Sequence, residues 1–191
     1  MFLFVWSSLA LAADASIGLT AAGEAAFGES LNDNLRGTSL GGELYASFPL
    51  PMQLEGKVSV GYRRLSGIDT KEFLWYSPIS ATVGFAIPVG RASLFADLGP
   101  SYVVWASTPT DRKKIGPSGG NLGALIEGGV RYPTMLLQPS LHHPDAKIGG
   151  LDLVGSVGVR WSYARTSVDD PKQVALDFSA LRLNLGVAAR F

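Results

Sequence analysis

The stretch Leu181-Arg-Leu-Asn-Leu-Gly-Val-Ala-Ala-Arg-Phe191 decides the fold, and it ends the printed chain. Every second residue from Leu181 to Phe191 is apolar. The residues between them are small or polar: Arg182, Asn184, Gly186, Ala188 and Arg190. An alternation of period two places one row of side chains on each face of a β-strand. The pattern predicts a final strand with one apolar face, followed by no helix or further domain.

Composition narrows the class of protein. A chain of 191 residues is long enough for one domain. It has no cysteine, which excludes disulfides, thiolate metal sites and cysteine nucleophiles. Its formal net charge is zero, so nothing indicates a nucleic-acid partner. Charged residues make up only 17%, yet no interior run has the roughly 18 apolar residues of a spanning helix. Hydropathy spread over many alternating segments is typical of a membrane β-barrel.

The N-terminus is predicted to be an export signal. Met1 to Leu11 is apolar without strand-like alternation, and Ala10-Leu11-Ala12 is a small-x-small cleavage site. An apolar first strand is the alternative, and the missing alternation argues against it. We therefore expect a signal peptide at residues 1–12 and a barrel at residues 13–191. No basic residue precedes the apolar run, so the signal is expected to be either incomplete at its start or atypical in form.

Eight segments alternate in this way. They are residues 17–27, 39–48, 54–63, 73–87, a segment from 94 onward, 122–132, 151–163 and a segment that begins near Val174. The fifth loses its alternation near Pro100, which predicts a bulge or a change of row. The eighth starts out of phase with Leu181, so its first part either stands clear of lipid or is followed by a bulge near Ser179. An even number of strands predicts an all-β fold, an eight-stranded antiparallel up-and-down transmembrane barrel.

Two features predict the orientation. The connections after the second, fourth and sixth segments start at Pro49, Pro88 and Pro133, whereas the other connections are longer and polar. Aromatic residues of the apolar rows form two groups. Phe27, Tyr62, Phe73, Trp75, Trp161 and Tyr163, with Tyr102 or Trp105, lie beside the longer loops, and Phe48, Phe85, Tyr132 and Phe191 lie toward the proline turns. Such girdles mark the two membrane interfaces, so both termini are expected on the periplasmic side.

The polar rows would face the barrel interior. They carry Glu24, Glu43, Glu55, Lys57, Asp97, Glu127, Arg131, Asp152, Arg160, Arg182 and Arg190. Eight strands enclose a space that side chains fill, and an unpaired buried charge is costly. The rows therefore predict a network of paired charges that plugs the lumen. A gated ion path through Glu24, Glu127 and Arg160 is the functional alternative.

The tail pattern of Asn184, Gly186 and Phe191 resembles the C-terminal insertion signal of bacterial outer-membrane barrels. With the eight segments, the chain resembles the small barrels of the OmpA transmembrane domain and the OmpX class. The resemblance implies that the barrel assembly machinery and periplasmic chaperones recognise this signal during biogenesis. It also implies contact with outer-membrane lipid and lipopolysaccharide, and a monomer in the bacterial outer membrane.

Candidate chemistry is sparse. Ser140, His142, His143 and Asp145 are the only grouping of serine, histidine and acid, but they fall among prolines on a predicted periplasmic connection. We expect a polar turn there, rather than a catalytic triad or a metal site. Basic residues near the extracellular rim could meet lipopolysaccharide phosphates, directly or beside acids bridged by divalent cations. They are Arg36, Arg63, Arg64, Lys71, Arg112, Lys113, Lys114 and Arg165, and acids interspersed with them favour a solvated rim.

The leading hypothesis is a non-enzymatic outer-membrane barrel with a structural or surface-interaction role and no cofactor. The alternatives are an outer-membrane lipid A-modifying hydrolase or acyltransferase, a small pore, and a soluble lipocalin-like barrel with its apolar rows inside. The membrane assignment predicts two sets of side chains. Leu44, Val58, Val83, Ile126, Val157 and Leu185 should face outward, and Glu43, Lys57, Glu127, Arg160 and Arg182 inward.

Overall fold

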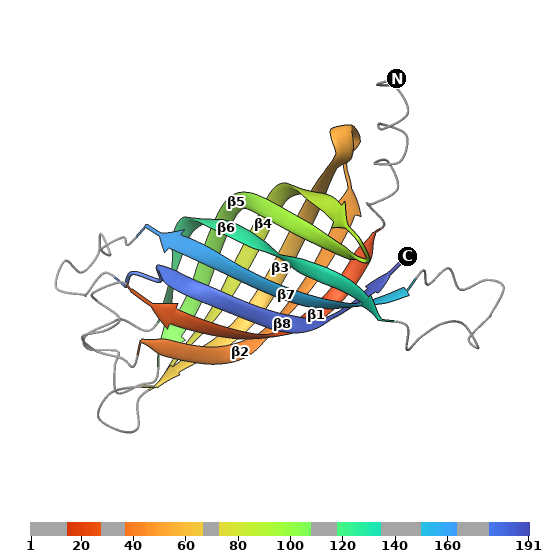
Figure 1. Ribbon diagram of the computed structural model, residues 1–191. Helices are drawn as coiled ribbons and strands as arrows, with labels where there is room; N and C mark the ends of the chain where they lie inside the picture. Colours follow the sequence, from red (N-terminus) through yellow and green to blue (C-terminus); the bar gives the residue numbers. More distant parts are fainter. Residues whose placement is uncertain (1–14, 28–36, 67–72, 108–117, 135–149, 164–175) are drawn as a thin grey trace, which may run out of the picture.

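A closed antiparallel barrel forms the protein, as the computed structural model shows for residues 15–27, 37–66, 73–107, 118–134, 150–163 and 176–191 (Figure 1). The strands are β1 (Ser16–Ala26), β2 (Thr38–Pro49), β3 (Leu54–Ser66), β4 (Phe73–Val89), β5 (Ala92–Ser107), β6 (Ser118–Thr134), β7 (Gly150–Ser162) and β8 (Ala180–Arg190). Each strand pairs with its sequence neighbours, and β8 pairs with β1. The predicted eight-stranded up-and-down barrel is confirmed.

Closure occurs between β1 and β8. Their register runs from Ser16 opposite Arg190 to Ala26 opposite Ala180. Every strand therefore has a partner on both sides, which satisfies backbone groups without water and allows a sheet to cross hydrocarbon. Residues 1–12, the predicted signal peptide, lie outside the described residues. No helix among the described residues is long and apolar enough to span a membrane.

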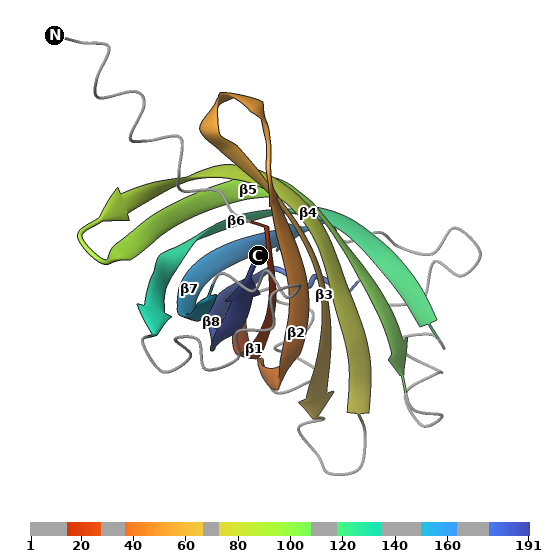
Figure 2. The ribbon, with the colours of Figure 1, turned by 90° about the vertical axis from the view of Figure 1, so that its right-hand side faces the viewer.

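Two short turns, β2–β3 and β4–β5, lie at the end of the barrel where β1 begins and β8 finishes (Figures 1 and 2). The β2–β3 connection contains a 3-10 turn at Pro51–Gln53, preceded by the strand-ending Pro49. The β4–β5 connection turns at Gly90, whose φ of 63° is a left-handed conformation that glycine adopts without steric penalty. Proline and glycine thus form these two turns.

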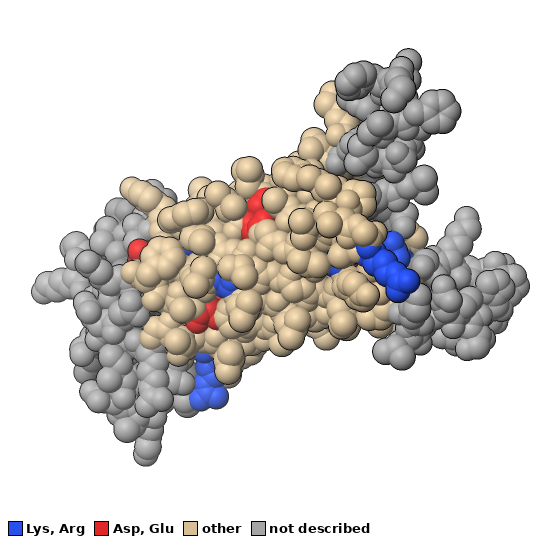
Figure 3. All heavy atoms as spheres, in the orientation of Figure 1, with Lys and Arg blue, Asp and Glu red and all other residues tan. Residues whose placement is uncertain are grey.

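The outer wall is apolar and the interior is charged. All six side chains predicted to face outward are between 46% and 68% exposed: Leu44, Val58, Val83, Ile126, Val157 and Leu185. The five predicted to face inward are at most 5% exposed: Glu43, Lys57, Glu127, Arg160 and Arg182. Figure 3 shows a wall with few charged atoms. A lysine or arginine facing lipid at mid-bilayer costs about 2–4 kcal/mol, so this arrangement suits hydrocarbon. The lipocalin-like alternative is wrong.

Exposed aromatic side chains lie in two belts. One belt lies at the end opposite the short turns and contains Phe27, Tyr62, Tyr102, Trp161 and Tyr163. The other lies at the end of the short turns and contains Phe48, Phe85, Tyr132 and Phe191. Aromatic rings with polar edges favour the two membrane interfaces, and the apolar wall between the belts corresponds to the hydrocarbon layer. Trp105 does not belong to a belt, because its side chain is inside and only 9% exposed.

The fifth strand has neither a bulge nor a change of row. Ile79 opposite Tyr102 and Val83 opposite Leu98 belong to a single register of β4 with β5, which passes Pro100 without a shift. The alternation disappears from the sequence because Val103 and Trp105 are apolar although they face inward. Both rows are apolar in this part of the strand, so period two cannot be recognised.

The eighth strand begins at Ala180, later than the sequence indicates. Leu176 and Phe178 precede it in a non-strand conformation and are 2% and 1% exposed. Of the two alternatives, the one that keeps this segment away from lipid is correct, and no bulge at Ser179 is needed. The segment avoids lipid by entering the barrel. The predicted start near Val174 is wrong, because residues 176–179 are not in a strand conformation.

Candidate functional site: the polar interior

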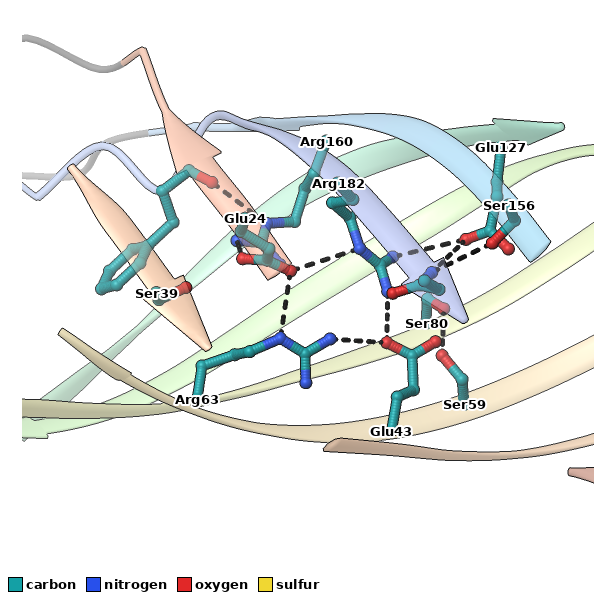
Figure 4. A network of polar contacts seen from close by, with 12 residues as sticks. Glu24, Ser39, Glu43, Ser59, Arg63, Ser80, Glu127, Ser156, Arg160 and Arg182 are labelled. Atoms are coloured by element: carbon teal, nitrogen blue, oxygen red, sulfur yellow. Dashed lines mark hydrogen bonds and ion pairs between the residues drawn. The ribbon is translucent and has the colours of Figure 1, made fainter. Parts of the chain in front are cut away.

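Glu24 on β1 pairs with three arginines in the barrel interior (Figure 4). Arg160 on β7 donates to both of its carboxylate oxygens, at 3.1 Å to Oε1 and 2.7 Å to Oε2. Tyr76 on β4 donates its hydroxyl hydrogen to Oε2 at 2.6 Å. The Nε atoms of Arg63 on β3 and Arg182 on β8 lie 3.5 Å and 3.2 Å from Oε1. One carboxylate therefore connects five strands across the lumen.

Glu43 on β2 is a second acceptor for the same arginines. Its Oε2 lies 3.0 Å from Nη2 of Arg63 and also pairs with Nη2 of Arg182. Arg63 further donates to the backbone oxygen of Gly42 at 2.5 Å. Two carboxylates thus share three guanidinium groups, and this cluster has one positive charge more than it has negative.

Glu127 continues the network toward the short turns. Its Oε1 accepts a hydrogen bond from Nζ of Lys57 at 2.9 Å, and the same ammonium lies 2.9 Å from Oδ2 of Asp97. Its Oε2 lies 3.8 Å from Nη1 of Arg182, which links both clusters. The second cluster has one negative charge more than it has positive, which balances the first. The two clusters together form a single neutral network.

Two further ion pairs lie at the end of the short turns. Arg131 forms a bidentate pair with Glu55, with 2.6 Å between Nη1 and Oε2, and its guanidinium carbon lies 4.8 Å from the centre of the Phe95 ring. Arg190 reaches Asp152 at 3.6 Å. The Arg190 side chain is 36% exposed, so this pair is partly solvated and contributes little to stability.

The opposite end of the interior is apolar. Its buried cluster consists of Leu65, Leu74, Tyr76, Val103, Trp105, Leu176 and Phe178. The segment before β8 is held there by its backbone: Nε of Arg160 donates to the Phe178 oxygen at 3.0 Å, and Nδ2 of Asn121 donates to the Leu176 oxygen. The Phe178 and Tyr76 rings lie 5.2 Å apart. A hydrophobic plug therefore lies beside the Glu24 cluster.

The described interior side chains enclose a small space near the centre of the second cluster. A cavity of about 10 Å³ lies among Lys57, Phe95, Glu127, Arg131 and neighbouring residues. This volume holds about one water molecule. An aqueous channel through the barrel would need a continuous row of water-sized cavities from one end to the other.

All eleven residues of the predicted lumen network have their side chains in the interior, Arg190 at its margin. The sequence interpretation misplaced Arg63, which it assigned to the extracellular rim. Arg63 is fully buried and pairs with Glu24 and Glu43. Its position on the polar row with Lys57 was the signal that indicated an inward side chain. Tyr76 and Phe95 were also missed, although each lies on the inward row of its strand.

The three residues of the predicted assembly signal have different surroundings. Asn184 faces inward and its Nδ2 donates to Oγ of Ser156 at 3.2 Å. Gly186 lies so close to β1 that a Cβ atom would be 2.1 Å from the Leu19 oxygen. Phe191 is exposed, and its backbone nitrogen donates to the Ala15 oxygen at 2.8 Å. Packing alone therefore favours asparagine and glycine at the first two positions.

Most other candidates lie outside the described residues. These are Ser140, His142, His143 and Asp145, and the rim residues Arg36, Lys71, Arg112, Lys113, Lys114 and Arg165. Arg64 is described and faces outward on β3. Within the described part of the chain, no three histidine, aspartate or glutamate residues are grouped so that they could hold a metal ion.

Solved structures with the same fold are outer-envelope proteins of bacteria. The outer membrane protein OprG from Pseudomonas aeruginosa is similar with a TM-score of 0.57 and 11% identity, over 94% of this chain and 96% of that chain. A major outer membrane protein from Thermus thermophilus gives 0.56 and 18%, over 92% and 99%. Neisserial surface protein A gives 0.55 and 11%, over 93% and 96%.

No protein-family model matches the chain, and no curated protein matches it. At identities of 11–18% the similarity concerns the fold. The described strands and these matches agree with the resemblance that the alternating segments and the tail indicated. The chain has the fold of the small eight-stranded outer-membrane β-barrels.

Proposed function

We propose that the chain is a non-enzymatic barrel of the bacterial outer membrane with a structural or surface-interaction role, and that paired charges close its lumen. The apolar wall between two aromatic belts supports the membrane location. The fold shared with outer-membrane proteins supports the outer membrane in particular. The barrel would act as a monomer whose partners are outer-membrane lipid and, during biogenesis, the assembly machinery and periplasmic chaperones.

The network of paired charges in the interior is the observation that supports this proposal most directly. Glu24, Glu43 and Glu127 connect four basic residues into one network, and a cavity beside Lys57 and Glu127 has a volume of about 10 Å³. A permeating ion would have to displace buried pairs, and each broken pair leaves an uncompensated charge. The apolar plug at Phe178 adds a second barrier.

Conductance tests the proposal. Refolded protein in planar lipid bilayers is expected to give no stable current steps, because the proposed closure by paired charges and the apolar plug would deny ions a water path. Incorporation is verified by flotation of liposomes and by the heat-dependent gel mobility of folded barrels, and a porin in the same liposomes serves as positive control. Long-lived, reproducible steps from the purified protein would overturn the closed lumen and establish a small pore.

A second measurement addresses the enzymatic alternative. Lipid A that is incubated with the folded barrel should keep its mass and its number of acyl chains. Loss or gain of an acyl chain would show an acyl hydrolase or acyltransferase and overturn the non-enzymatic role.

A further inference from the structure

Arg64 is an unusual residue on the outer wall. Among the strand residues that the structure describes, it is the only charged residue on the outward row, next to the fully buried Arg63. Its register partners are Leu40 on β2 and Trp75 on β4. The guanidinium carbon lies 5.1 Å from the centre of the Trp75 ring, which itself stacks on Tyr62 at 5.1 Å. The cation is therefore positioned by an aromatic platform.

This platform lies at the interface level of the membrane. Tyr62 belongs to the aromatic belt opposite the short turns, which is the extracellular belt in the proposed orientation. A lipid-facing arginine is tolerated at that level, where it reaches the lipid headgroups. The planar guanidinium matches phosphate oxygens through two parallel hydrogen bonds. The ligand chemistry that Arg64 favours is thus a headgroup phosphate.

An apolar groove lies deeper on the same wall. It has a volume of about 550 Å³ and extends from Ile17 on β1 to Leu122 on β6. Ala46 on β2, Val58 on β3 and Ala81 on β4 are register neighbours in its lining. The short alanine side chains leave space on either side of Val58. The groove extends from Tyr102 of one aromatic belt into the apolar wall between the belts, and so faces hydrocarbon. An acyl chain is the occupant that this environment offers.

The groove and the cation lie on one row of β3. Val60 lines the groove, and Tyr62 separates it from Arg64. The four residue steps from Val60 to Arg64 correspond to about 13 Å of strand. On a strand tilted by about 45° this length leads from the headgroup layer into the hydrocarbon. One lipid molecule can therefore reach both features.

We propose that Arg64 and this groove form a binding site for one phosphorylated lipid of the outer leaflet. Arg64 binds the phosphate, Trp75 and Tyr62 hold the guanidinium, and one acyl chain lies along Val60, Val58 and Ala81. The inference rests on the proposed outer-membrane function, since it names the lipid partner and its site. A second copy of the chain could cover the groove, but its own apolar wall would offer Arg64 no phosphate or other anion. A phosphorylated lipid supplies both an acyl chain for the groove and an anion for Arg64.

Native mass spectrometry of the refolded full chain in detergent tests the site. The probes are bisphosphorylated lipid A, the same lipid A without phosphates, and glucosamine phosphate without acyl chains. Wild-type protein should bind the bisphosphorylated lipid about tenfold more tightly than the dephosphorylated one. Arg64→Ala should abolish this preference. Ala81→Phe, which fills the groove, should weaken binding of both lipids, and glucosamine phosphate should not compete.

Two variants serve as matched controls. Arg91→Ala removes an exposed arginine at the β4–β5 turn, at the other end of the barrel, and Ala21→Phe adds a ring to an exposed position on β1 that does not line the groove. Both should bind lipid as the wild type does. Equal binding by Arg64→Ala, or full competition by glucosamine phosphate, would overturn the inference. The inference would also be overturned if the wild type formed a dimer that Ala81→Phe dissociates, because a second copy of the chain would then occupy the groove. Each of these results leaves the conductance test unaffected, so failure of the site is distinguishable from failure of the proposed function.

Discussion

Replacement of Glu24 by alanine is expected to lower the free energy of unfolding by about 3–5 kcal/mol, because it leaves buried cations without their carboxylate. Arg160 would lose both of its carboxylate contacts, and Arg63 and Arg182 would keep only the acids on their other side. Glu24→Gln should lose most of the same stability, since it retains the volume and removes the charge. The measurement is equilibrium unfolding of the refolded barrel by urea in lipid vesicles.

Asp152→Ala is the matched control for Glu24→Ala. Asp152 also faces inward, but its partner Arg190 is partly solvated and lies 3.6 Å away. Removal of this acid should cost about 0–1 kcal/mol. An equal loss of unfolding free energy in the two variants would contradict this expectation. It would show that the network around Glu24 stabilises the barrel no more than the isolated pair of Asp152 and Arg190 does.

Phe178→Ala is the second substitution that we expect to lower the free energy of unfolding strongly. The ring is 1% exposed and packs with Tyr76 inside the barrel, so its removal creates a cavity between the plug and the Glu24 cluster. Truncation of a buried phenylalanine costs about 3–5 kcal/mol. The same unfolding assay measures the loss, and fluorescence of Trp105 in the same cluster should report the looser packing.

Phe85→Ala is the corresponding control on the lipid side. The Phe85 side chain is 49% exposed on the outer wall, where lipid can fill the space that the ring leaves. Its replacement should cost less than half of what Phe178→Ala costs. A loss at Phe85 that equals the loss at Phe178 would contradict the assignment of the two sides of the wall.

The barrel could be predicted from the sequence because period two survives in most strands. In the segment from Leu181 to Phe191, the residues that face lipid are apolar and those that face the lumen are small or polar. A single strand therefore indicates both environments. The signal disappears where the interior itself is apolar. Val103, Trp105 and Phe178 face inward as apolar residues, and there the predictions of a bulge or row change in β5 and of an early start of β8 were wrong.

The partners in the lumen could not be predicted in the same way. Alternation places Glu24 and Arg160 inside, but their contact joins residues 136 positions apart. It depends on the shear of a closed barrel, which sets the strands that face each other across the lumen. Arg63 and Arg64 show the limit clearly. They are adjacent in the chain, yet one is buried in the network and the other stands on the outer wall.

The most direct test of the account compares Trp105 with Trp161. Both lie toward the end of the barrel opposite the short turns, but Trp105 is 9% exposed inside the barrel and Trp161 is 47% exposed on its outer wall. Variants that retain one of these two tryptophans, with every other tryptophan of the chain replaced by phenylalanine, are reconstituted in vesicles of brominated phospholipid. We predict strong quenching of Trp161 fluorescence and little quenching of Trp105, because bromine atoms on acyl chains reach only the outer wall. Quenching of Trp105 equal to or greater than that of Trp161 would contradict a membrane barrel with a closed, lipid-free interior.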